Sequence, residues 1–542
     1  MEWSTTFFPL SKMLTWLNTL NFSYEILKIL LIASIAYTSH YYYKYFTREN
    51  PLPGPFPLPF IGNILQVFRN FSFDLENVQA KYGDLCEFHM GSKRFILLGN
   101  NDLIEKIMKQ VISNPFHNRV SDDSEGLKEI GVLNTGLLFN NNYDDWKLHR
   151  KIFVKVLLLP SFVRQSIKFV QDNFLEMEQY WEKLGEDEVL EFDRWMKYYF
   201  FDTIFIVTTS KPAYSLANYY NNVTPNEKSN IPESILKECN GFVEAVSSFA
   251  HGILYFHSIP RAIRNFPGVR RYTRNLKERI DWFRNNVENI VKSKREEISK
   301  TPIDQKLKPD MLTMLMTVNT ERDVTEKIAD DENDEPISDK NIAASFMEAM
   351  LGGIDTGSNS ICFLVYYLEN NPRVKQRMIE EIEYVLGKDP NKSFTFEDLS
   401  KLKYVKAVIK EASRVLTVSP IRTKRNSAPE VIGGYKWSKG TDFLLNMDRI
   451  QNHKSYWKDP DVFNPDRFMD KENPDFKNRL YMFGGTMRKC PGRNFGMMEL
   501  KATLVMLYRK YDIELMGKLK QHIGASRTCD ELKVKLRKRK NL

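Results

Sequence analysis

The sequence has few cysteines for its length, and their spacing excludes a zinc ribbon and a disulfide framework. Five cysteines are spread over 542 residues, and no two of them form a CxxC pair. They are Cys86, Cys239, Cys362, Cys490 and Cys529. The chain also lacks a phosphate-binding loop, an HExxH metal motif and an internal repeat. This cysteine usage favours a reducing compartment.

Charge and apolar content set broad limits only. The net charge is +9, and 42% of the residues are hydrophobic. Such a basic balance would suit an acidic partner or anionic lipid, although it is also typical of an ordinary soluble surface. We expect no nucleic-acid partner. The length would allow one large core or several domains, but nothing after residue 50 marks a domain boundary.

The first fifty residues differ from the rest. An apolar stretch at 22–46 ends in a tyrosine cluster, Tyr41 to Tyr43, and Lys44 and Arg48 follow it. Tyrosines favour the headgroup level and basic residues favour the cytosolic side. We therefore predict that residues 1–50 form a single-pass membrane anchor. A cleaved signal peptide is the alternative, but no small-residue cleavage site is present. Because the apolar run is short, a tilted or partly interfacial helix is a further alternative.

The chain after the anchor is predicted to be mainly α with small β-sheets. Prolines at 51–63 indicate a semi-rigid, extended hinge before one domain at 64–542. Between Lys81 and Asn100, β-branched and aromatic residues punctuated by glycines predict a β-hairpin. Apolar residues three and four apart predict helices at Ile280 to Ser299, Asn341 to Glu369 and Val374 to Leu386. The acidic stretch Asp330 to Glu335 is expected to be a solvated loop, and Lys533 to Lys540 a charged terminal strand.

The segment FGGTMRKCPGRNFGMMELK, Phe483 to Lys501, has the features of a thiolate ligand loop. A tight turn would present the sulfur of Cys490 to a metal, and backbone N–H groups would hydrogen-bond it. Pro491 has no N–H, so Gly492 is the natural donor. A helix that begins near Phe495 would help to keep the sulfur deprotonated. The alternative is a buried cysteine that acts as a small hydrophobe.

This spacing resembles the heme-binding loop of the cytochrome P-450 family, F-x-x-G-x-R-x-C-x-G. Phe483, Arg488, Cys490 and Gly492 match that pattern, whereas Thr486 replaces the first glycine. The resemblance implies that Cys490 is the proximal ligand of the heme iron.

Two upstream segments match the family in order. Glu411 and Arg414 lie three apart on one predicted helix face, where they can pair. Arg467, in FNPDRF, matches the arginine that completes the family's structural Glu-Arg-Arg network. On this resemblance the network stabilises the core near the heme and has no catalytic role.

The segment MLGGIDTGSNS, Met350 to Ser360, places glycines, an acid and a hydroxyl inside a helical pattern. It resembles the family's oxygen-activation signature, in which Thr356 contacts dioxygen and Asp355 relays protons. Ser358 is a second relay candidate, since Gly357 stands where the family often has a hydroxyl. The alternative is close helix packing at Gly352 and Gly353, with the Thr356 hydroxyl bonded back to its own helix.

The resemblance also implies cationic partners for the heme propionates. Trp146 and Arg150 lie four apart on one helix face, where the indole N–H and the guanidinium could reach one anionic group. Arg488 is a second cationic candidate. Arg425 is a third, with Lys424 as its alternative in an uncertain register.

These matches extend over nearly all of residues 51–542 and imply a monooxygenase of the eukaryotic microsomal type. It would bind heme b (iron protoporphyrin IX) and insert one oxygen atom of O2 into a lipophilic substrate such as a fatty acid, sterol, terpenoid or xenobiotic. Electrons would come from NADPH through a flavoprotein reductase, with cytochrome b5 as a further partner. Lys489 and nearby basic residues would face that reductase, and the alternative is a solvated positive face. The catalytic domain would lie on the cytosolic side of the endoplasmic reticulum membrane.

The substrate side of the cavity is expected to include residues of 242–260, together with Phe346, Met350 and Ile354. Two other functions are compatible with the sequence. One is a reductase-independent heme-thiolate isomerase or peroxygenase, against which the Asp355–Thr356 pair argues. The other is a non-enzymatic heme-binding sensor.

Overall fold

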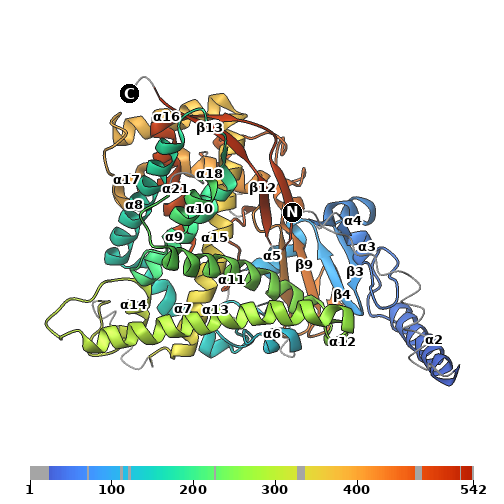
Figure 1. The fold of residues 1–542 in the computed structure, drawn as a ribbon. Coiled ribbons are helices and arrows are strands. Elements are labelled where there is room, and N and C mark those ends of the chain that lie inside the picture. The colour runs from blue at the N-terminus through green and yellow to red at the C-terminus, as the bar shows by residue number, and fades with distance from the viewer. Residues whose placement is uncertain are drawn as a thin grey trace, which may run out of the picture.

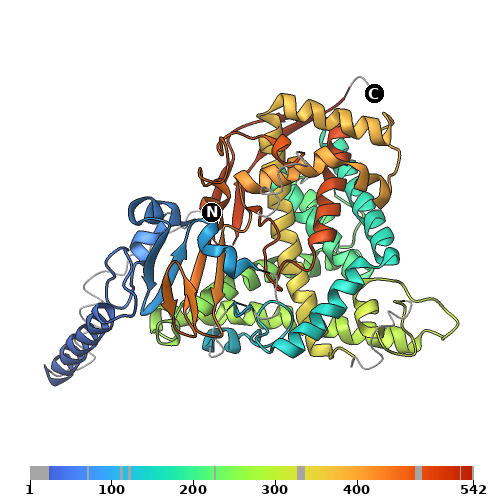
Figure 2. The same ribbon diagram turned by 180° about the vertical axis from the view of Figure 1, so that it is seen from behind.

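The computed structural model describes residues 24–69, 72–109, 114–116, 118–119, 124–224, 228–325, 336–469, 479–524 and 526–539. Most of the described chain is helical, and a smaller part built around a twisted sheet lies to one side (Figures 1 and 2). The predicted class, mainly α with small sheets, is confirmed. The acidic stretch Asp330 to Glu335 lies outside the described residues.

Helix α15 (Asp339–Glu369) passes through the middle of the helical part in both views (Figures 1 and 2). It begins where the Ser338 side chain accepts a hydrogen bond from Asn341 N, and it ends before Pro372, which has no N–H to continue it. Its first half is buried in one apolar cluster and its second half in another. The helix therefore joins the two main cores of the protein.

Several long helices pack against α15. They are α9 (Phe192–Thr209), α11 (Glu233–Ser258), α13 (Pro267–Lys300), α18 (Lys403–Val415) and α21 (Arg493–Lys510). Helix α11 continues through most of the apolar segment 242–260 and ends at Ser258. Gly252 allows this close packing, since a Cβ there would overlap the Ile280 side chain of α13.

The other described helices are mostly shorter. They are α3 (Ile64–Val67), α4 (Leu75–Tyr82), α5 (Asn101–Met108), α6 (Glu125–Glu129), α7 (Tyr143–Leu158), α8 (Pro160–Leu184), α10 (Ser215–Val223), α12 (Arg261–Arg264), α14 (Met311–Thr317), α16 (Pro372–Leu386), α17 (Phe396–Lys401), α19 (Met447–Asn452) and the 3-10 turn η1 (Pro465–Phe468). All three helices predicted from periodicity lie within observed helices.

The largest described sheet has the strand order β3-β4-β9-β6. Its strands are β3 (Leu85–Met90), β4 (Lys93–Leu98), β9 (Asp442–Asn446) and β6 (Ile421–Arg425). β3 and β4 form the predicted hairpin, β9 runs parallel to β4, and β6 runs antiparallel to β9. The sheet therefore places β9, from the C-terminal half, beside the N-terminal hairpin, and β6 forms the edge beyond β9.

The remaining strands form small sheets. They are β1 (Phe68–Arg69) with β2 (Ser72–Phe73), β7 (Glu430–Ile432) with β8 (Tyr435–Trp437), β11 (Lys520–Ile523) with β12 (Arg527–Glu531), and β10 (Tyr511–Leu515) with β13 (Lys533–Lys538) and β5 (Leu190–Glu191). The basic segment near the C-terminus thus contains a strand, as expected.

Helix α2 (Tyr24–Phe46) projects from the sheet side of the molecule (Figure 1). Its C-terminal end contacts the proline-rich segment, where Tyr37 stacks on Phe60 with ring centroids 4.2 Å apart, and Tyr42 stacks on Phe56 at 5.3 Å. Among the described residues, no helix combines the length and apolar character needed to cross a bilayer.

Two glycines set the distance between α15 and α9. A Cβ at Gly353 would lie 2.6 Å from Ile204 Cδ1, and a Cβ at Gly357 would overlap the ring of Phe200. Gly352, on the next face, has no atom within 4 Å of such a Cβ. Close packing therefore explains Gly353 and Gly357, whereas Gly352 faces open space.

Replacing Gly357 by alanine should destabilise the protein, because overpacking of this kind costs about 1–3 kcal/mol. The matched control is Gly352→Ala, which should stabilise the helix by about 1 kcal/mol, since it removes an interior glycine without a clash. Thermal midpoints of the two variants should move in opposite directions. Shifts of the same sign and size would contradict this packing.

Candidate functional site

The loop before α21 is folded tightly around Cys490. Cys490 N donates to Phe483 O at 2.8 Å, and Gly484 and Thr486 adopt positive φ angles of 83° and 64°. Left-handed backbone is ordinary for glycine and uncommon for a β-branched residue. Gly492 directs its N–H to the Cys490 sulfur. The loop thus has the turn and the backbone donor that the sequence predicted.

The environment of the Cys490 thiol acts on its pKa in two directions. Burial raises the pKa above its ordinary value, whereas the Gly492 N–H and the charges of Arg150, Arg119 and Arg422 lower it. The net result is a raised pKa, so the thiol is protonated at neutral pH unless a cation binds it. A metal ion supplies such a cation and stabilises the thiolate.

Cationic side chains from distant segments gather around this loop, and their hydrogen bonds go to neutral oxygens. They are Arg119, Arg150, Arg422, Lys424 and Arg488. Burial and mutual repulsion lower the pKa of Arg488 to about 9 and that of Arg422 to about 10. Within the described part of the chain, Arg422 Nη1 and Arg488 Nε are buried and have no hydrogen-bond partner.

Such an arrangement is costly without an anion, because buried charges and donors need partners. A group with two carboxylates would neutralise part of the positive charge, and a metal at its centre would accept the thiolate. The residues around Cys490 therefore fit heme, whose propionates and iron supply both.

The predicted pair Trp146 and Arg150 lies in this cluster, although the indole N–H is already engaged. Trp146 Nε1 donates to Leu137 O at 3.2 Å. The guanidinium carbon of Arg488 lies 4.1 Å from the Trp146 ring centre, and that of Arg150 lies 5.5 Å from it. Trp146 thus makes cation–π contacts with both guanidinium groups, and its N–H donates to the protein backbone.

Leu137 connects three elements of the site. Its carbonyl accepts from Trp146 and from Arg488 Nη1, the latter at 3.2 Å. Its N–H donates to Glu348 Oε2 of α15 at 2.6 Å, and Leu138 N donates to Glu348 Oε1 at 2.8 Å. Burial raises the pKa of Glu348 to about 7, while these N–H groups and nearby arginines oppose that shift. One buried loop therefore joins α15 to the cysteine loop.

The structure does not bring Arg425 into the cluster. Arg425 Nη1 pairs with Asp442 at 3.1 Å on one face of β6, whereas Arg422 and Lys424 face the cysteine loop. Alternation along a strand sends residues 422 and 424 to one side and residue 425 to the other. Lys424, the alternative to Arg425, and Arg422 are therefore the candidates on β6 for binding a heme propionate.

Sequence reasoning missed Arg119 and Arg422. The alternation of β6 could have identified Arg422, since it shares a face with Lys424. Arg119 stands in an irregular segment and carries no comparable signal. Its guanidinium donates to Arg488 O at 2.9 Å.

The hydroxyl groups of α15 lie on two faces. Thr356 is exposed on the open face of Gly352, and its hydroxyl donates back to Gly352 O at 2.5 Å. Ser360 follows on this face and donates to Thr356 O at 2.6 Å. Ser358 is buried and donates to Ile354 O at 2.8 Å, so it is turned away from Thr356. The self-bonded Thr356 hydroxyl matches the structural alternative, yet its exposure leaves it accessible to a ligand.

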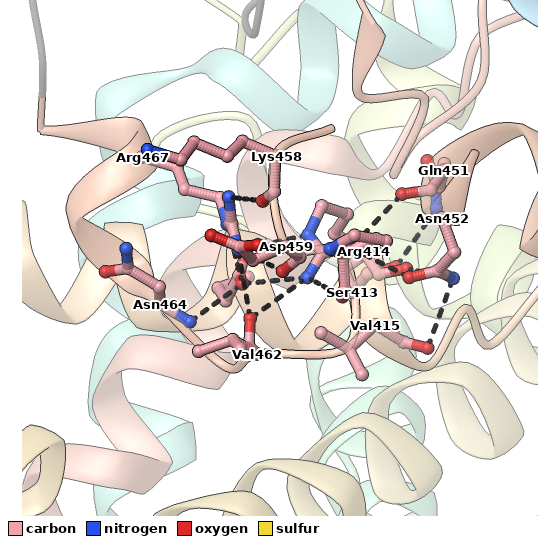
Figure 3. A network of polar contacts seen from close by, with 12 residues as sticks. Ser413, Arg414, Val415, Gln451, Asn452, Lys458, Asp459, Val462, Asn464 and Arg467 are labelled. Carbon is pink, nitrogen blue, oxygen red and sulfur yellow. Dashed lines mark hydrogen bonds and ion pairs between the residues drawn. The ribbon is translucent and has the colours of Figure 1, made fainter. Parts of the chain in front are cut away.

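Glu411, Arg414 and Arg467 form one buried network. Arg414 binds both carboxylate oxygens of Glu411 at 2.9 Å, and Arg467 Nε lies 3.3 Å from Glu411 Oε1. Figure 3 shows Arg414 and Arg467 converging on the loop that includes Asp459 and Val462, and both donate to Val462 O. The network therefore fixes an irregular segment against α18.

Comparisons with known proteins find one family. A family model described as cytochrome P-450 matches residues 52–528. Similar curated proteins include probable cytochrome P-450 513F1 of Dictyostelium discoideum, 24% identical over 90% of this chain and 95% of its own. Cytochrome P-450 3A14 of Cavia porcellus is 23% identical over 90% and 89%. Ferruginol synthase of Salvia fruticosa is 22% identical over 90% and 93%.

Replacing Arg414 by methionine should destabilise the protein by about 3–5 kcal/mol, because it leaves the buried Glu411 carboxylate without its partner. Arg377→Met is the control, since Arg377 pairs with Asp466 of η1 at 2.6 Å while both side chains are half exposed. Removing an exposed pair costs about 0.2–1 kcal/mol. Denaturation midpoints should show a large loss for the first variant only. Similar losses would contradict a special role for the buried network.

Proposed function

Since the chain belongs to the cytochrome P-450 family, whose members are heme-dependent monooxygenases, we propose that it oxygenates a lipophilic substrate with Cys490 as the heme ligand. The observation that carries this proposal is the partly exposed Cys490 thiol inside a cluster of cationic side chains. When bound, heme supplies the iron at which O2 is activated, and a thiolate ligand donates electron density that favours O–O cleavage.

The residues of the chain would hold the heme from three sides. Cys490 would bind the iron, with Gly492 N–H tuning the sulfur charge. Arg488, Lys424 and Arg422 would bind the propionates. Arg488 and Arg422 each have a buried N–H without a partner, and the pKa of Lys424 is strongly lowered. Arg150 stands beside them, and Phe483 closes the cysteine turn through its carbonyl.

We assign proton delivery to the open face of α15. Thr356 would hold a proton at its hydroxyl next to O2. Its hydroxyl now donates a hydrogen bond to Gly352 O, and it would donate to O2 instead. Asp355 would bring protons from solvent. Ser360 is better placed than Ser358 to continue this path, because it shares the exposed face of Thr356.

The substrate is proposed to be lipophilic. Phe346, Met350 and Ile354 are buried in the apolar cluster on the N-terminal half of α15, which ends just before Thr356. Helix α11 adds further aromatic residues to that cluster, among them Phe249 and Phe256. These surroundings favour an apolar ligand such as a fatty acid, sterol, terpenoid or xenobiotic.

The electron donor is proposed to be an NADPH-dependent flavoprotein reductase, with cytochrome b5 as a further partner. A groove of about 290 Å³ borders the cysteine loop, and its charged lining residues are all basic: Lys406, Lys410, Lys489 and Arg493. Positive charge on this side would attract an acidic protein and orient it close to Cys490.

We further propose attachment to the endoplasmic reticulum membrane through residues 1–50, with 51–63 as a hinge and 64–542 as a cytosolic catalytic domain. Exposed apolar side chains on α2 support a contact with lipid, among them Leu31, Ile32 and Ile35. The stacked Tyr37–Phe60 and Tyr42–Phe56 pairs would fix the pose of the catalytic domain relative to that contact.

Reconstitution with NADPH and a reductase on a panel of lipids should give oxygenated product. Thr356→Ala should lower the rate of product formation by about 100-fold, the lower end of the effect of general acid catalysis, whereas Thr356→Ser should retain most of the rate. Product formed from peroxides without reductase, and unaffected by Thr356→Ala, would favour an isomerase or peroxygenase. Heme binding without product from any lipid would favour a sensor.

A further inference from the structure

Thr486 has a backbone conformation that disfavours its residue type. Its φ is 64°, a left-handed value that a β-branched residue rarely adopts, and its side chain is buried. The family pattern has glycine here, and glycine takes this conformation without steric cost. A threonine at this position therefore needs a compensating contact.

The Thr486 hydroxyl provides two such contacts. Its oxygen accepts from Lys424 Nζ at 3.2 Å and from Arg488 N at 3.1 Å. The first joins the cysteine loop to β6, and the second lies inside the loop itself. Glycine could provide neither, because it has no side-chain oxygen.

Lys424 depends on this contact more than an ordinary lysine would. It is buried, and the two acceptors that contact its ammonium, Thr486 Oγ1 and Phe116 O, are both neutral. Burial and the charges of Arg119, Arg488 and Arg422 lower its pKa strongly. A buried ammonium among other cations is stable only beside an anion. The Lys424 side chain must therefore be oriented toward that anion.

We propose that Thr486 is a positioning residue whose hydroxyl holds the Lys424 ammonium toward a heme propionate, and that this contact offsets the cost of its left-handed backbone. The inference rests on the proposed function, since the propionate is the expected anion. Thr486 and Lys424 would thus act as one unit in a site where the family pattern has glycine in place of Thr486.

A double-mutant cycle on the heme-loaded, full-length protein tests this proposal. The variants are Thr486→Gly, Thr486→Ser, Lys424→Met and the Thr486→Gly/Lys424→Met double variant. Two readouts are used, the rate of heme transfer to an excess of an apo heme-binding protein and the midpoint reduction potential. The wild-type spectrum of the reduced, carbon-monoxide-bound form is recorded first.

We expect Thr486→Gly to lose heme about tenfold faster than wild type, and Thr486→Ser to match wild type. In the Lys424→Met background, Thr486→Gly should have a much smaller effect. Its contact with Lys424 is already absent there, and relief of the strain offsets the loss of the contact with Arg488 N. Lys424→Met should shift the potential to a more negative value, since a positive charge near the heme is removed.

Wild-type heme retention in Thr486→Gly, or an equal effect of this substitution in both backgrounds, would overturn the proposal. If Lys424→Met does not fold, Lys424→Gln, which removes the positive charge but stays polar, replaces it, and the absence of coupling with Thr486→Gly again contradicts the proposal. A wild-type protein without a thiolate spectrum would instead contradict the proposed function. Coupling in both readouts with a normal wild-type spectrum supports the inference.

Discussion

The site depends on one constraint, the burial of several cationic side chains around Cys490. Arg119, Arg150, Arg422 and Arg488 come from four separate segments of the chain, and burial lowers the pKa of each guanidinium. Repulsion between buried cations opposes their assembly, so the fold must hold them by other contacts. An anionic ligand would remove much of this cost. Ligand binding and the stability of the site are therefore expected to be coupled.

The contacts that hold the cluster are mainly to backbone oxygens of irregular segments. Leu137 O accepts from Arg488 and Trp146, and Glu348 fixes the same loop from α15. Irregular backbone can be buried only where such partners exist. The Glu411–Arg414–Arg467 network does the same for the segment after α19. Side-chain hydrogen bonds and ion pairs thus hold these irregular segments in place.

Sequence patterns predicted the parts of this fold that regular spacing determines. The long helices follow from a period of about 3.6 residues, and the β3–β4 hairpin from β-branched and aromatic residues bounded by glycines. Tertiary contacts could not be inferred in this way. Arg425 was placed in the site because its strand register was unknown, and Arg119 carries no periodic signal. Thr486 was recognised as a departure from the family loop, but only the structure relates it to a positive φ and to Lys424.

The central claim is that Cys490 binds the heme iron as a thiolate. The absorbance spectrum of the reduced, carbon-monoxide-bound protein tests it most directly, when wild type is compared with Cys490→Ala. We predict a thiolate-type spectrum in wild type and its loss in the variant. A histidine-type spectrum in wild type, or a thiolate-type spectrum that survives in Cys490→Ala, would contradict the claim.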